Sequence, residues 1–129
     1  MSTKSKGELE FAEIDDYYRA HQTTLETIAK SISELRRRSA AAATAGEKAE
    51  IENRIVRLED DLRLHEDKLT AFEAGREAIE PPTEEQLEHL RKLLERVDEL
   101  TAQGLAVEQL VGVAKDSIQT FKAIHPDDQ

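Results

Sequence analysis

Two stretches of the chain repeat apolar residues at alternating spacings of three and four residues. Side chains spaced in this way lie along one narrow stripe of an α-helix, as in the seam of a coiled coil. The sequence therefore predicts two long helices whose seams pack against other helices. The seam positions are Phe11, Ile14, Tyr18, His21, Leu25, Ile28, Ile32 and Leu35 in the first stretch, and Ile51, Ile55, Leu58, Leu62, His65, Leu69, Phe72, Arg76 and Ile79 in the second.

The repeat changes phase once, between Leu35 and Ile51. These residues are 16 positions apart. Because each residue of a helix advances by about 100°, a continuous helix would place them on roughly opposite faces. We therefore expect the chain to fold back on itself, with helices over residues 8–38 and 47–80 and a turn at about residues 39–47.

Local signals mark the ends of the second helix. Gly46 offers a place for the turn, because glycine adopts backbone conformations that other residues avoid. Pro81 and Pro82 are expected to end the helix at Glu80, since proline lacks the backbone N–H and restricts the residue before it. Thr83 begins a capping box that predicts the start of the next helix.

Two shorter helices are predicted in the C-terminal part, over residues 84–102 and 106–124, with Gly104 between them. Both have a wide apolar face, and a wide face contacts more than one neighbour. We expect them to pack on a weak second stripe of the second long helix, which consists of Leu64, Ala71 and Ala78.

The expected fold is therefore all-α. A long antiparallel coiled-coil hairpin, residues 8–80, follows a disordered lead, residues 1–7. A shorter helical hairpin, residues 83–125, packs on the first, and together they form a partial four-helix bundle. The longer helices would leave the tip of the first hairpin projecting alone.

The net charge of the chain argues against some classes of binding partner. Net charge is −10, with most of the acidic excess after residue 46, so phosphate-rich surfaces would be repelled. We expect neither nucleic-acid nor membrane binding. The chain has no cysteine and no run of about 18 apolar residues. These features predict a cytoplasmic protein.

His21 and His65 occupy seam positions that are otherwise apolar. The predicted register pairs His21 with Leu69 and Leu25 with His65, which places the imidazoles in neighbouring layers. The favoured interpretation is a polar interruption that fixes the register. A pH-sensitive seam is an alternative, because histidine titrates near pH 6.5. A metal site is the weakest candidate, since two histidines supply too few ligands.

Two groups of residues are candidates for partner binding. Arg36, Arg37 and Arg38 lie at the end of the first helix, where cations also complement the helix dipole. The last helix has an apolar stripe too wide for one neighbour. Its candidate contacts are Leu110, Ile118 and Phe121.

No catalytic, phosphate-binding or di-iron motif is present in the sequence. We therefore expect a non-enzymatic protein–protein interaction module without a cofactor, which acts by helix-to-helix docking as an adaptor, assembly factor or regulatory subunit. A homo-oligomer, preferably a dimer, is expected. One alternative is an acidic inhibitor or immunity-type protein that occupies a basic site on its target. A second is a pH or metal sensor that uses His21 and His65.

Overall fold

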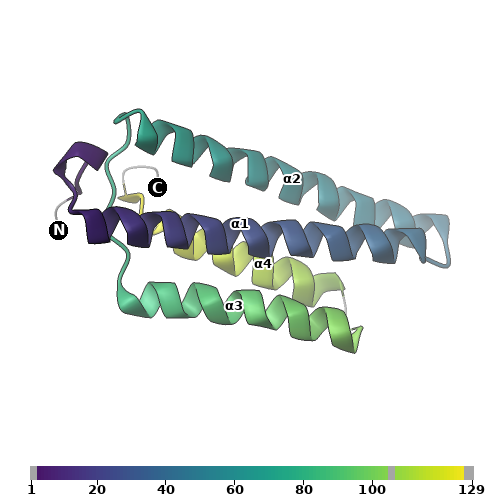
Figure 1. Ribbon diagram of the computed structural model, residues 1–129. Coiled ribbons are helices and arrows are strands. Elements are labelled where there is room, and N and C mark those ends of the chain that lie inside the picture. Colours follow the sequence, from purple (N-terminus) through teal and green to yellow (C-terminus); the bar gives the residue numbers. More distant parts are fainter. Residues whose placement is uncertain (1–2, 105–106, 127–129) are drawn as a thin grey trace.

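The computed structural model describes residues 3–104 and 107–126 (Figure 1). Within them the chain forms a short 3₁₀ turn, Lys6–Glu8, and then only α-helices. The helices are α1 (Phe11–Ala40), α2 (Ala45–Glu73), α3 (Glu84–Gln103) and α4 (Val107–Lys122). The predicted all-α fold, a long helical hairpin followed by a shorter one, is confirmed. No helix of the described residues is both long enough and apolar enough to cross a membrane.

Helix α1 lies at the centre of the bundle and packs against each of the other three helices. Helices α3 and α4 also pack on each other, whereas α2 packs on α1 and makes only a few contacts with α4. Figure 1 shows α2 and α3 on opposite sides of α1. The expectation that residues 84–102 pack on the second long helix is therefore wrong, because α3 contacts α1 and α4 instead.

Two neighbouring stripes of α1 are buried, which explains its central position. The second stripe consists mostly of small or polar residues and is offset from the seam by about 100°, since each of its members precedes a seam position by one residue. Two buried stripes need more than one neighbouring helix, and α2, α3 and α4 all pack on α1. The buried members are His21, Ile28, Ile32 and Leu35 in the seam, and Tyr17, Ala20, Thr24, Thr27, Ser31 and Glu34 in the second stripe.

The core has two parts that differ in chemistry. Near the α1–α2 turn it is aliphatic, with Ile28, Leu35 and Leu58 among its members. Near the other end it contains the rings of Tyr17 and Phe72. Because these rings are larger than aliphatic side chains, α2 stands further from α1 there, and Figure 1 shows the two helices diverging toward the C-terminal end of α2.

Helix α2 ends at Glu73, so the prediction that it continues to Glu80 is wrong. Gly75 adopts a left-handed backbone conformation with a φ of 72°. This conformation ends helices and is readily available only to glycine. Arg76 and Ile79 consequently lie beyond the helix and are not seam positions.

Ile79 is nevertheless fully buried. It pairs with Lys4, and the N–H of each residue donates a hydrogen bond of 2.8 Å to the carbonyl of the other. Of the predicted disordered lead, residues 1–7, the structure therefore places residues 4–7 in regular hydrogen-bonded structure. Residues 1 and 2 lie outside the described residues.

The remaining boundaries are close to those predicted. Helix α1 begins at Phe11, which is 89 % exposed and so lies outside the seam. At the start of α3, Thr83 and Gln86 form the predicted capping box, with hydrogen bonds of 2.9 and 3.1 Å. Gly104 has a φ of 66° and ends α3, as its position indicates.

The substitution Gly75→Ala is expected to lower the free energy of unfolding by about 1 kcal/mol or more, because a Cβ atom is disfavoured at positive φ. Gly112→Ala is the matched control. Gly112 is exposed on α4 and a Cβ there meets nothing within 4 Å, so alanine should raise stability by about 0.5–1 kcal/mol. Urea denaturation measures both changes. A Gly75→Ala variant of unchanged stability would indicate that α2 continues past Glu73.

Candidate functional site

His21 and His65 lie in the same layer between α1 and α2, not in neighbouring layers as predicted. Their imidazole rings stack with centroids 3.9 Å apart and with 9° between the ring planes. The pairing differs from the predicted pairs, His21 with Leu69 and Leu25 with His65, by four residues, which is about one helical turn. The reason is the position of the turn: it occupies residues 41–44, within the predicted range, whereas the predicted register centres it near Ala45.

Each imidazole also binds the backbone of the opposite helix. Nε2 of His21 lies 3.0 Å from the carbonyl oxygen of His65, and Nε2 of His65 lies 2.9 Å from the carbonyl oxygen of His21. Because a carbonyl oxygen only accepts, we assign a proton to both Nε2 atoms. These reciprocal bonds form only when the two residues are opposite each other, so they favour the interpretation that the pair fixes the register.

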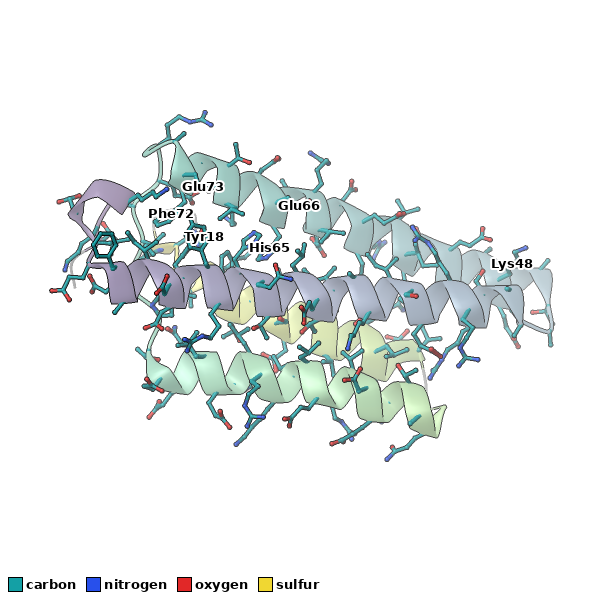
Figure 2. All side chains as sticks on the ribbon, viewed as in Figure 1. Tyr18, Lys48, His65, Glu66, Phe72 and Glu73 are labelled. Atoms are coloured by element: carbon teal, nitrogen blue, oxygen red, sulfur yellow. The ribbon has the colours of Figure 1, made fainter. Side chains whose placement is uncertain are left out.

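Burial keeps both imidazoles neutral near pH 7. It lowers the pKa of His21, although the carbonyl of His65 and the carboxylates of Glu66 and Glu73 partly oppose this shift. Burial and repulsion from His21 lower the pKa of His65 to about 3. Figure 2 shows where His65, Glu66 and Glu73 lie on α2. Protonation near pH 6.5 is therefore unfavourable while the helices remain packed, so a response of the pair to pH requires the helices to separate.

The metal-sensor alternative also gains no support from the described residues. No group of three or more histidine, cysteine, aspartate or glutamate side chains among them is arranged to hold a metal ion. The Nε2 atoms of His21 and His65 are already engaged with backbone carbonyls.

A third buried histidine, His125, contributes to the same end of the core. Its Nε2 lies 2.9 Å from the hydroxyl of Tyr17, 108 residues away in the sequence. Tyr17 in turn packs against Phe72, with ring centroids 4.1 Å apart. Neither Tyr17 nor His125 was a predicted site residue, because nothing local in the sequence indicates a contact over this separation.

The predicted partner-binding stripe of the last helix is mostly buried by other residues of the same chain. Leu110 is fully buried and Phe121 is 1 % exposed. The ring of Phe121 lies edge-on to both histidines, with centroids 5.6 Å from His21 and 4.5 Å from His65. The premise that this face awaits a partner is therefore wrong for Leu110 and Phe121, because α1 runs beside α4. Ile118 alone remains half-buried.

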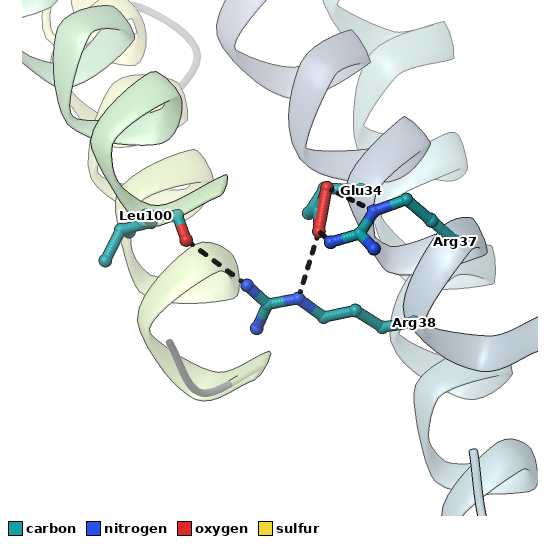
Figure 3. Close-up of polar contacts among 4 residues, drawn as sticks. All are labelled: Glu34, Arg37, Arg38 and Leu100. Atoms are coloured by element: carbon teal, nitrogen blue, oxygen red, sulfur yellow. Dashed lines mark hydrogen bonds and ion pairs between the residues drawn. The ribbon is translucent and has the colours of Figure 1, made fainter. Parts of the chain in front are cut away.

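The three arginines are engaged in ion pairs within the chain, and Figure 3 shows those of Arg37 and Arg38. Arg36 pairs with Glu59 at 2.6 Å, and Arg37 and Arg38 both bind Glu34. These hydrogen bonds hold the pKa of the Glu34 carboxyl below its usual value. Arg38 also donates to the carbonyl of Leu100 in α3, at 3.3 Å.

The tip of the hairpin extends beyond α3 and α4 in Figure 1, as predicted. Arg38 does not project freely, however, because it connects α1 to the C-terminal turn of α3, where the helix dipole favours a cation. Its side chain is 14 % exposed, against 60 % for Arg36 and 64 % for Arg37. Glu34, which binds two of the arginines, was not a predicted site residue.

A groove runs between α2 and α4, where the two helices have few contacts. We call it the α2–α4 groove. Three cavities of about 230, 20 and 410 Å³ lie along it; the second and third share lining residues, and the first is separate from them. Its lining residues include Leu64, which is 51 % exposed, and Ile118. Leu64 and Ala71 belong to the stripe that the sequence predicts to be covered by another helix. The apolar or small residues of the lining are Ile51, Leu64, Ala71, Val107, Ile118 and Phe121.

Comparisons of the chain with protein-family models, with curated proteins and with solved structures find no match.

The free energy of unfolding is expected to fall as the pH is lowered from about 7 to about 5. In the unfolded chain each imidazole binds a proton near pH 6.5, whereas in the folded chain the pKa of His21 is lower and that of His65 is about 3. The unfolded state therefore binds more protons in this range. Stability that is fully present above pH 6.5 is lost as the pH falls, by at most about 1.4 kcal/mol per pH unit for each histidine.

Urea denaturation at a series of pH values measures this slope. The double substitution His21→Leu and His65→Leu should abolish it. His89→Gln is the control, because His89 lies at the surface beside Asp116, and this variant should retain the slope. Wild-type stability that does not change between about pH 7 and 5 would mean that the two histidines are not buried as a neutral pair.

Proposed function

We propose that the protein is a non-enzymatic interaction module that binds a helix of a protein partner in the α2–α4 groove. The observation that carries this proposal is the incomplete packing of α2. Of its 29 residues only four are buried, namely Ile55, Leu58, His65 and Phe72. The half-exposed Leu64 lies beside Ile118, the one residue of the predicted partner-binding stripe that the chain leaves partly uncovered.

Burial of the groove supplies a driving force for docking. Covering a well-exposed leucine contributes on the order of 1.5–3 kcal/mol, and apolar surface enclosed by charged residues is typical of interaction sites. The groove is bounded by two helices on a central third, so a partner helix entering it would gain two neighbours at once. This is the helix-in-groove mode of recognition.

Arg36 and Arg37 remain secondary candidates for partner contact. Both side chains are more than half exposed at the hairpin tip. Each is already paired with a carboxylate of the chain, so a partner would have to compete with Glu59 or Glu34 for them. Arg38 is a weaker candidate because Glu34 and the carbonyl of Leu100 occupy its donors.

The acidic-inhibitor alternative receives less support. Much of the negative charge of α3 is compensated locally, since Arg91 pairs with Glu88 and Glu95 and Arg96 pairs with Glu99. A surface that mimics a polyanion needs carboxylates free of such partners.

A photoreactive benzoylphenylalanine residue in place of Leu64 tests the docking site in cells. It is expected to cross-link to one or a few discrete proteins, because Leu64 lies in the groove. The matched control replaces Val56, which is 57 % exposed on the same helix but lies outside the groove. Equal cross-linking from both positions, or none from Leu64, would count against the α2–α4 groove as the docking surface.

A further inference from the structure

Carboxylates outnumber cations among the charged residues that line the α2–α4 groove. The lining has six carboxylates and three cations. Arg54 lies 2.5 Å from Glu108, and Lys68 lies 3.9 Å from Glu77, so two of the carboxylates have a cation beside them. The other four take part in no ion pair among the described residues, and they are Glu47, Glu50, Asp61 and Asp67.

The apolar part of the groove has the length of a helix. Ile51 and Val107 lie at one end, Leu64 and Ile118 in the middle, and Ala71 at the other end. From Ile51 to Ala71 the distance along α2 is about 30 Å at 1.5 Å per residue, which matches a guest helix of about 18–20 residues.

We propose that the α2–α4 groove binds a partner helix that carries lysine or arginine on both sides of an apolar stripe. This inference rests on the proposed function, and it specifies the chemistry of the partner. The apolar stripe of the partner helix lies on Leu64 and Ile118, while its lysine or arginine side chains approach the carboxylates at the edges of the groove. Complementary charge of this kind raises the association rate and selects against acidic helices.

The charge distribution also orients the guest. At the Ile51 end the lining holds Glu47, Glu50 and the paired Arg54 and Glu108, so the carboxylates are in excess by two. At the other end Lys68 and Lys122 offset most of the charge of Asp61, Asp67 and Glu77. The more basic end of the guest helix therefore lies over the Ile51 end.

A second copy of the chain fits the groove less well than a basic helix does. A symmetric pairing through the groove would place the same surplus of carboxylates opposite itself. The chain as a whole carries a net charge of −10, so long-range repulsion adds to the unfavourable local contacts.

The test uses the full chain and three synthetic helical peptides of about 18 residues, labelled for fluorescence anisotropy. The first has leucines at helical spacing flanked by lysines, the second has the same leucines flanked by glutamates, and the third has the lysines with serines in place of the leucines. The first peptide is expected to bind at least about tenfold more tightly than either of the others. Raising the salt concentration should weaken its binding.

Two matched variants locate the binding. Leu64→Gln should weaken binding of the lysine–leucine peptide by about tenfold, whereas Val56→Gln should leave it unchanged, because Leu64 and Val56 are similarly exposed but only Leu64 lines the groove. Glu47→Gln combined with Glu50→Gln should weaken it severalfold. Far-UV circular dichroism confirms that each variant retains its helices.

The outcomes separate this inference from the proposed function. If the lysine and glutamate peptides bind equally and both depend on Leu64, the groove docks helices but the basic-partner inference is overturned. The same holds if no peptide binds while Leu64 still cross-links to a discrete partner. A dimer that light scattering detects and that Leu64→Gln dissociates would show a second copy in the groove and would also overturn the inference.

Discussion

Helix α1 has to bury two sides at once, and the arrangement of the other helices depends on this. Its seam needs a partner helix along its whole length, which only the similarly long α2 provides. Its second stripe, from Tyr17 to Glu34, is buried as well, so further helices, α3 and α4, pack on α1. Because α2 is covered by α1 on one side and has few contacts with α4, the groove is a direct consequence of the central position of α1.

The attachment of α2 to α1 is specific as well as extensive. At the wider end, the stacked histidines and the rings of Tyr17 and Phe72 fill the space between the helices. Two imidazole–carbonyl hydrogen bonds fix which residues face each other. Polar atoms buried in this way add specificity when all are paired and are costly when they are not. Thr24 Oγ1 and Ser117 Oγ lack a hydrogen-bond partner in the described part of the chain, so α1 and α4 carry some of that cost.

Much of the fold could be predicted from the sequence because heptad spacing and capping residues act locally, as at Thr83 and Gly104. The register of α2 against α1 could not be predicted. Leucine and histidine both satisfy a seam position, and the exact turn residues decide between registers that differ by one helical turn. The end of α2 was missed because Ile79 keeps the spacing of the repeat although it is buried through its pairing with Lys4. Of the candidate site residues, only the proximity of His21 to His65 and the partial exposure of Ile118 were predictable, since the coverage of Leu110 and Phe121 depends on how α4 packs on α1.

Native-state hydrogen exchange tests most directly whether α2 is the peripheral helix of a bundle centred on α1. In this method, segments that open before global unfolding exchange with a lower free energy of opening. Amides in the middle of α2 are expected to exchange through an opening smaller than global unfolding, while those in the middle of α1 exchange only when the whole chain unfolds. Equal free energies of opening for the middle of α1 and α2, both at the global value, would contradict this account.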